Sequence, residues 1–139
     1  MQLNAYVSFN GNCADAIDFY ERTLSARTEM KTQFAQSPMA SECLPADLTK
    51  IMHARLVIGN DVLMMSDSPA SMPYQGMKGF MLSLSYDDAN EGRRIFAALA
   101  DGGTVTMPIQ STFWAAAFGM LTDRFGIPWM VNAGPVAAS

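Results

Sequence analysis

Side chains that bind metals or crosslink a small fold are scarce in this sequence. The chain of 139 residues has one histidine, His53, and two cysteines, Cys13 and Cys43. Two cysteines cannot build a disulfide framework, and a single histidine excludes most dense metal sites made from histidine and cysteine. The cysteine content is compatible with a reducing compartment, so we expect a cytoplasmic protein.

Charged residues and long apolar runs are also few. Nine Lys and Arg stand against thirteen Asp and Glu, which gives a formal net charge of −4 and disfavours binding to nucleic acid. The longest apolar run, Trp114 to Leu121, is far shorter than the ~18 residues that a membrane-spanning helix needs. Met1–Asn4 has neither the basic start nor the apolar stretch of a secretory signal. We therefore expect no nucleic-acid partner and no membrane span.

Hydrophobic residues, in contrast, make up half of the chain. This fraction and length fit one compact domain with a real core, and they exclude intrinsic disorder. Apolar residues at every second position of Leu3–Phe9 predict a strand, which Gly11 ends. Asn12 is typical of a helix N-cap, with Asp15 at the capping-box position, and helical spacing predicts an amphipathic helix from Cys13 to Leu24.

Three more strands are predicted in the first half. One spans Ala26–Phe34, and Ile51–Ile58 and Asp61–Ser66 form a hairpin whose turn, Gly59-Asn60, suits the positive φ of tight hairpins. The intervening segment Ala35–Thr49 has no hydrophobic period. It is a loop whose length is typical of a lid or a disordered excursion in a compact domain.

The second half repeats this order after a linker at 68–76. A strand is predicted at Phe80–Tyr86, and Asp88 caps a helix that carries Glu91 at the capping-box position. Asp101, Gly102 and Gly103 end this helix. Three strands follow at Thr104–Ile109, Phe113–Leu121 and Ile127–Asn132, and the tail 133–139 is expected to be frayed.

The chain therefore predicts an α+β fold made of two tandem βαβββ modules. The first module spans 1–67 and the second spans 77–135, within a single domain. One such module has a sheet with a helix on one face only, so the other face must be covered or left as a cavity wall. Two modules side by side, with their sheets curved toward each other, would enclose a cleft.

Several blocks of residues resemble a known family over nearly the whole chain. They are Tyr6–Cys13, Ala16–Tyr20, His53-Ala54, Met64–Asp67, Thr112–Trp114, Phe118-Gly119 and Thr122–Met130. With them the chain resembles the vicinal oxygen chelate superfamily, which includes glyoxalase I, bleomycin-resistance proteins, extradiol dioxygenases and fosfomycin-resistance enzymes. Within it, the chain looks like a PhnB-type protein, a group often labelled 3-demethylubiquinone-9 3-methyltransferase-like. The resemblance implies a glyoxalase/bleomycin resistance-like fold.

The resemblance also indicates where a metal would be held. In the superfamily's metal enzymes the ligands come from the first and fourth strands of each module, which here places them at or beside Ala5, Met64, Met81 and Met130. Alanine cannot ligate, and a thioether suits copper(I) rather than hard divalent ions. We therefore expect no metal and no cofactor, and side chains that pack a dry cavity wall. Glyoxalase-like isomerisation is disfavoured, because it needs a Lewis acid.

The remaining candidate residues have a functional and a structural interpretation. His53 is a candidate general base or single metal ligand at the cleft mouth, or it bonds a neighbouring backbone group. Cys13 lies on the apolar stripe of its helix and is interpreted as a buried structural cysteine. Trp114 and Trp129 either line the cleft or seal an interface. The candidates for the ligand-binding cleft are Val7, Phe9, His53, Arg55, Met64, Met81, Trp114 and Met130.

The sequence favours a binding protein over an enzyme of known reaction. We expect it to hold a small apolar or aromatic molecule in a metal-free cleft, as bleomycin-resistance proteins sequester their drug. One alternative is a metal-dependent superfamily enzyme of the lyase, isomerase or dioxygenase type with unrecognised ligands. Another is a protein that has no functional pocket and serves an interaction role. No Gly-rich loop opens a Rossmann helix, so the methyltransferase label has no support from a donor-nucleotide site. Paired modules in this superfamily often belong to two chains, which predicts a homodimer.

Overall fold

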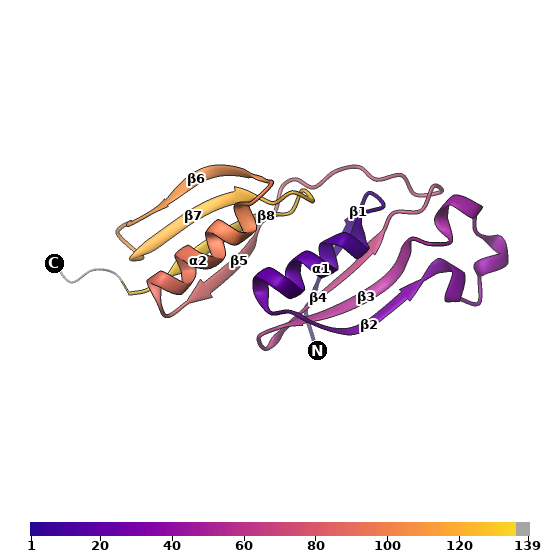
Figure 1. The fold of residues 1–139 in the computed structure, drawn as a ribbon, viewed down its shortest axis with the longest axis horizontal. Coiled ribbons are helices and arrows are strands. Elements are labelled where there is room, and N and C mark those ends of the chain that lie inside the picture. Colours follow the sequence, from indigo (N-terminus) through magenta and orange to yellow (C-terminus); the bar gives the residue numbers. More distant parts are fainter. Residues whose placement is uncertain (136–139) are drawn as a thin grey trace. The chain divides into compact units, whose positions relative to one another are not determined.

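Residues 1–135 of the chain are described by a computed structural model and fall into two units. The first unit is Met1–Gln75 and the second begins at Gly76. Each unit contains one strand, one α-helix and then three strands, in that order (Figure 1). The expected α+β class with two tandem βαβββ modules is therefore confirmed. The prediction that the two sheets curve around a shared cleft stays a prediction.

The first unit is a four-stranded mixed sheet with one α-helix. Its strands lie in the order β1-β4-β3-β2, with β1 parallel to β4 and the other neighbours antiparallel. The predicted hairpin is present between β3 and β4, and Gly59 in its turn has a φ of 62°. The elements are β1 (Ala5–Phe9), α1 (Cys13–Leu24), β2 (Arg27–Gln33), β3 (Ile51–Ile58) and β4 (Asp61–Asp67).

The second unit repeats this arrangement with different lengths. Its strands lie in the order β5-β8-β7-β6, with β5 parallel to β8 and the other neighbours antiparallel. The elements are β5 (Leu82–Tyr86), α2 (Ala89–Ala100), β6 (Thr104–Gln110), β7 (Ala117–Thr122) and β8 (Pro128–Ala133). The predicted frayed tail is 133–139. Of this segment, Ala133 ends β8 and 136–139 lie outside the described residues.

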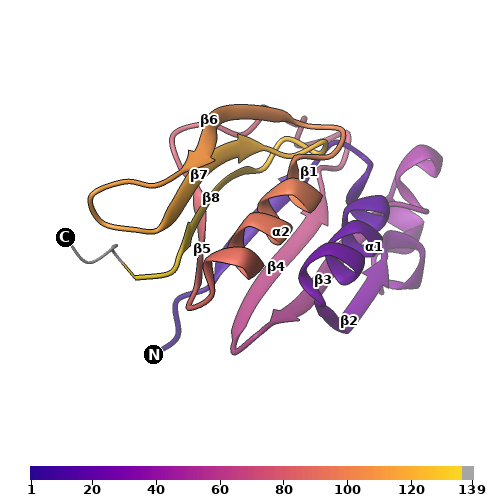
Figure 2. The same ribbon diagram turned by 60° about the vertical axis from the view of Figure 1, so that its left-hand side comes forward.

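Each helix packs on its own sheet, α1 on β2, β3 and β4 and α2 on all four strands of the second sheet (Figure 1). Figure 2 shows α1 beside β2 and β3. In the first unit the alternation in β1 buries Val7 and Phe9, which are 4% and 0% exposed, against the buried stripe of α1. In the second unit the residues of β8 that face α2 include Trp129 and Val131, which are also buried. Burial of an apolar face against a helix is what fixes the register of each sheet.

The two helices begin with different caps. The side chain of Asp88 accepts a hydrogen bond from the backbone of Asn90, so the predicted cap of α2 is confirmed. Asn12 is the N-cap residue of α1, as predicted, but its side chain makes no cap hydrogen bond. Asp67, at the end of β4, accepts a hydrogen bond from the backbone N–H of Cys13 instead (2.9 Å). The capping box of α2 is also absent. The Glu91 carboxylate pairs with Arg94 one turn further along.

The start of β7 differs from the prediction. The expected strand Phe113–Leu121 begins only at Ala117, and Phe113 and Trp114 lie in the loop that precedes it. The hydroxyl of Thr112 accepts hydrogen bonds from the backbone of Trp114 and Ala115, at 3.3 and 3.2 Å. This local side-chain turn takes the N–H groups that a strand would offer to its neighbour.

The segment between β2 and β3 is folded into three short 3-10 helices. They are η1 (Phe34–Gln36), η2 (Ala40–Glu42) and η3 (Pro45–Asp47). The ends of the segment are tied by hydrogen bonds from the Phe34 N–H to the Lys50 carbonyl and from the Ala35 N–H to the Leu48 carbonyl. This part of the chain, predicted as a loop, is therefore an ordered excursion at one end of the first sheet (Figure 1).

Neither α-helix in the described part of the chain is long and apolar enough to cross a membrane.

Candidate functional site

The face of the first sheet that α1 does not cover carries most of the first unit's candidate residues. Strand register places Tyr6 beside Met64, Met64 beside Arg55 and Arg55 beside Met30, so these four form one row across the sheet. On the same face, Ser8 pairs with Ser66 and Thr32 pairs with His53. We call this surface the first-unit face, and its residues are Tyr6, Ser8, Met30, Thr32, His53, Arg55, Val57, Val62, Met64 and Ser66.

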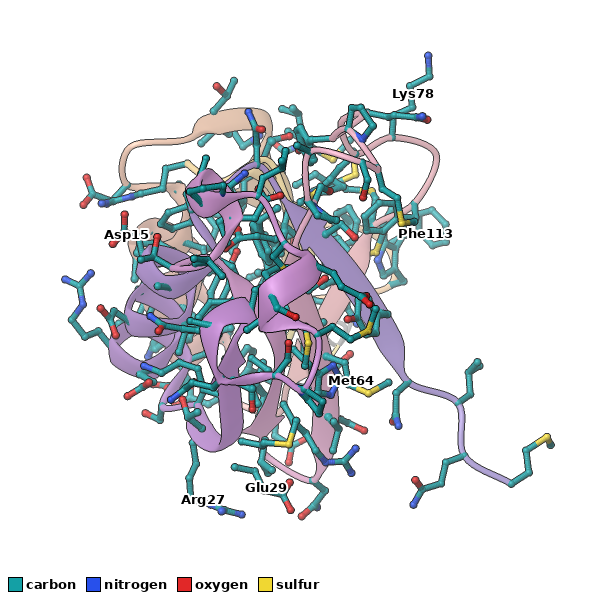
Figure 3. The ribbon with its side chains drawn as sticks, turned by 90° about the vertical axis from the view of Figure 1, so that its right-hand side faces the viewer. Asp15, Arg27, Glu29, Met64, Lys78 and Phe113 are labelled. Carbon is teal, nitrogen blue, oxygen red and sulfur yellow. The ribbon has the colours of Figure 1, made fainter. Side chains whose placement is uncertain are left out.

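Figure 3 shows the two sides of the first unit. Asp15, on α1, lies on one side, and the side chain of Met64 projects on the other. Met64 and its neighbours on this row are not buried in the core; Tyr6 is 51% exposed and Met30 is 42% exposed. The row therefore offers polarizable thioether and aromatic surface rather than filling the interior of the first unit.

Tyr6 and His53 form a polar pair across β4. The Tyr6 Oη atom lies 3.4 Å from Nδ1 of His53, at the outer limit of a hydrogen bond, and the ring centroids are 5.7 Å apart. Each ring has an apolar face and one or two polar atoms that can donate or accept a hydrogen bond. The pair can therefore contact a planar molecule and orient one polar atom of it.

Arg55 is already engaged. Its Nε atom lies 3.0 Å from the carboxylate of Glu29, which stands at a register shift between β2 and β3. The two side chains are 32% and 47% exposed, so the ion pair contributes little to stability. It does, however, place a carboxylate against the guanidinium next to Met64 and so offsets its positive charge.

The positions expected to hold a metal do not carry a suitable donor set. Register places Tyr6, rather than Ala5, beside Met64, and Ser83, rather than Met81, beside Met130. Phenol, hydroxyl and two thioethers do not fit a hard divalent ion, which takes imidazole and carboxylate ligands. Within residues 1–135, no three side chains from His, Cys, Asp and Glu come together.

Two predicted cleft residues belong to the core instead. Val7 and Phe9 point to the α1 side of the first sheet, where they are almost fully buried. The alternation of β1 was predicted, and its more apolar face, which carries Val7 and Phe9, packs on the helix. The polar face carries Tyr6, which the sequence analysis did not single out. Its place beside Ser8 in the alternation is the signal that could have found it.

The candidates of the second unit lie on or beside the face that α2 does not cover. Met130 stands in β8 next to Met120 and Ser83. Met81 precedes the first residue of β5. Trp114 lies in the loop before β7 and is 44% exposed. Its ring packs edge-on against the ring of Phe118, with the two ring centroids 5.1 Å apart.

The other two residues with open interpretations are structural. Trp129 is 2% exposed in the core of the second unit, and its Nε1–H donates to the buried carboxylate of Asp123 (2.9 Å). Cys13 is fully buried at the start of α1. Burial raises the pKa of its thiol well above the ordinary value, and the negative charge of Asp67 raises this pKa further. A thiol held in this way is a poor nucleophile.

Comparisons with known proteins agree on one family. The model of the Glyoxalase/Bleomycin resistance protein/Dioxygenase superfamily matches residues 2–131. The chain is similar to protein YjdN of Escherichia coli K12, with 41% identity over 140 residues and 95% of each chain covered. It is similar to the crystal structure of protein PA1353 from Pseudomonas aeruginosa, with 49% identity, a TM-score of 0.88, and 96% of this chain and 98% of that chain covered. The PhnB protein from Bacillus cereus shares the fold, with 18% identity, a TM-score of 0.80, and coverage of 96% and 100%.

Proposed function

Because the chain belongs to the Glyoxalase/Bleomycin resistance protein/Dioxygenase superfamily, we propose that it binds a small apolar or aromatic molecule without the help of a metal ion. The proposed site is the first-unit face. The observation that carries this proposal is the row Tyr6, Met64, Arg55 and Met30, which places aromatic and thioether surface side by side. Thioethers adapt to irregular apolar shapes and make favourable contacts with aromatic rings.

The polar groups on this face limit the ligand further. The Tyr6–His53 pair can satisfy one or two hydrogen bonds of an otherwise apolar molecule. A small number of convergent polar groups is typical of ligand-binding sites. Arg55 is neutralised by Glu29, and the chain carries a net charge of −4. A neutral or cationic aromatic ligand is therefore favoured over an anionic one.

The second unit offers similar chemistry on its own uncovered face. Met120 and Met130 are neighbours in register there, and Trp114 packs against Phe118. Met130 and Trp114 are therefore kept as candidate binding residues of the second unit's own face, separate from the first-unit face. His53 is proposed as a binding residue through its ring face and ring nitrogens rather than as a catalytic base.

A ligand screen with the intact chain tests this function. The protein is labelled with ¹³C at its methionine methyl groups, and neutral and cationic aromatic compounds are added while unfolding temperature and methyl signals are followed. A true ligand at 100 times its Kd adds about 2.7 kcal/mol to the free energy of unfolding. We expect such a ligand to shift the methyl signals of Met30 and Met64.

Matched variants make this screen specific. Met64→Ala and Tyr6→Ala should each weaken binding about tenfold, since each removes apolar contact of the order of 1.4 kcal/mol. Met72→Ala removes the same side chain from an exposed position in the linker, where Met72 is 70% exposed, and should leave binding unchanged. Absence of any stabilising compound across a broad aromatic library, or binding that survives both face variants, would overturn the proposal.

A further inference from the structure

The excursion between β2 and β3 surrounds a cavity that none of the residues of the first-unit face lines. Its volume is about 270 Å³, and all of its lining residues belong to the first unit. They are Phe34, Ser37, Met39, Glu42, Cys43, Leu44, Asp47, Met52, Pro69 and Ser71. The hollow is open to solvent on one side, where the lining residues Met39, Glu42 and Leu44 are exposed.

Specific interactions hold this cavity open. Asp47 is 4% exposed and forms an ion pair with Lys50 (2.9 Å) through one carboxylate oxygen. The other oxygen accepts a hydrogen bond from the backbone N–H of Ala70 (3.2 Å). Asp47 thereby ties η3 to the chain that follows β4, on the far side of the hollow. The walls are thus fixed before any ligand arrives, which lowers the entropic cost of binding.

The lining divides into an apolar interior and a rim with one carboxylate. Phe34, Met52 and Pro69 are half-buried, and Met39 and Leu44 are 60% and 56% exposed although both are large and apolar. Both oxygens of Asp47 are already engaged. Glu42 is exposed at the rim and takes part in no ion pair among residues 1–135.

We propose that this cavity is a second binding site, for a compact aromatic amine whose ring enters the apolar interior and whose ammonium group meets Glu42. A cavity of about 150 Å³ accommodates benzene, so by proportion one of about 270 Å³ accommodates about ten non-hydrogen atoms. The carboxylate at the rim selects a cation over an anion of the same size, since no cationic side chain lines the cavity. The methionines and Phe34 supply the polarizable contacts that an aromatic ring favours.

Phenethylammonium is the probe that tests this site, with 2-phenylethanol as its neutral analogue and phenylacetate as its anionic one. The experiment uses the full chain with ¹³C-labelled methionine methyl groups, so that Met39 and Met52 report on the cavity and Met64 reports on the first-unit face. We expect phenethylammonium to shift the Met39 and Met52 signals in a saturable way. The neutral analogue should bind more weakly, and the anion more weakly still.

Variants separate the cavity from the rest of the surface. Glu42→Gln should raise the Kd of phenethylammonium about threefold, as loss of an exposed ion pair does, and should leave the Kd of 2-phenylethanol unchanged. Asp18→Asn removes an exposed carboxylate from α1 and should change neither. Met52→Trp fills the cavity and should abolish the shifts. Ser71→Phe closes the rim and provides the same test if the tryptophan variant does not fold.

Several results would overturn this proposal. They are unsaturable shifts at Met39 and Met52, equal binding of the cation and the anion, and binding that persists in a folded cavity-filling variant. A shift confined to Met64 would place the probe on the first-unit face, which would support the proposed function and contradict the cavity site. Shifts confined to Met39 and Met52 support the cavity site whatever the outcome for the first-unit face.

Discussion

Asp67 is a single buried carboxylate that joins three elements of the first unit. One oxygen accepts from the backbone N–H of Cys13 at the start of α1, and the other accepts from the N–H of Ile51 at the start of β3 (2.8 Å). We predict that Asp67→Ala lowers the free energy of unfolding by about 3 kcal/mol, because two buried N–H groups lose a charged acceptor. Urea denaturation followed by circular dichroism measures this loss.

The control for this prediction is an aspartate without such partners. Asp18→Ala on the exposed side of α1 should change the free energy of unfolding by no more than about 0.5 kcal/mol. A loss of similar size in both variants would contradict the role assigned to Asp67.

The two thiols are expected to react very differently. Cys13 is fully buried, and burial together with the charge of Asp67 raises its pKa, whereas Cys43 is half-buried in the excursion. Iodoacetamide at about pH 8 should therefore alkylate Cys43 in the folded protein and leave Cys13 unmodified until denaturant is added. Peptide mass spectrometry identifies the modified residue. Rapid alkylation of Cys13 in the folded chain would show that the start of α1 opens far more readily than its packing implies.

At the scale of elements, the stability of the excursion between β2 and β3 should decrease at acid pH, because Asp47 becomes protonated. The hydrogen bond from the Lys50 side chain and the backbone N–H of Ala70 hold the pKa of this carboxyl below its usual value. Since the folded pKa lies below the unfolded value of about 3.9, the stabilisation is complete above that value and is lost as pH falls through the folded pKa. Protonation of Asp47 should therefore release η3.

The methyl signals of Met39 and Met52 report this release. On acidification they should stay in place down to about pH 4 and then move toward the positions of an unfolded chain before the core signal of Met65 changes. Asp47→Asn should abolish the separate step. Simultaneous loss of all three methionine signals in the unmodified protein would show that the excursion has no acid transition of its own.

Most of the elements could be predicted because their signals are local. Alternation identified β1, helical spacing identified α1, and the Asp88 cap and the Gly59-Asn60 turn were placed correctly. The predictions that failed depended on distant or competing groups. The side chain that accepts a hydrogen bond at the start of α1 is Asp67, 54 residues beyond Cys13, rather than Asn12. A local Thr112 turn delays the start of β7. The packing of the excursion depends on contacts with Ala70, which no local pattern reveals.

The site was predictable only in part for the same reason. His53 and Arg55 are two residues apart in the predicted strand Ile51–Ile58 and were therefore placed on one face of it, and the structure adds Met64 of β4 beside Arg55. Tyr6 was missed because its contact with His53 crosses a strand that comes later in the sequence. The cavity lined by Met52 was also missed, since it depends on three short helices that have no hydrophobic period.

At the scale of the whole molecule, family membership confirms the resemblance that the sequence blocks indicated. We predict in addition that the chain is a homodimer. The outer edges of β2 and β6 pair with no other strand within residues 1–135, and Phe113 and Trp114 are 85% and 44% exposed. Unpaired edges and exposed aromatic residues favour association.

Light scattering coupled to gel filtration measures the oligomeric state. The mass should correspond to two chains at micromolar concentration, and Phe113→Ser should shift the equilibrium toward one chain. Lys78→Ser changes an exposed side chain of the second unit and should leave the mass unchanged. A single-chain mass at the highest attainable concentration would contradict the prediction.

The central claim is that this chain binds a small molecule without a metal ion. At the paired positions of the first and fourth strands of each unit, where metal ligands were expected, it carries Tyr6, Met64, Ser83 and Met130. The most direct test is elemental analysis of protein purified without a histidine tag, after incubation with Mn²⁺, Fe²⁺, Ni²⁺ or Zn²⁺ and removal of the excess. The account predicts far less than one divalent ion per chain under every condition. One tightly bound ion per chain, lost in His53→Ala, would contradict it and would favour a metal-dependent enzyme.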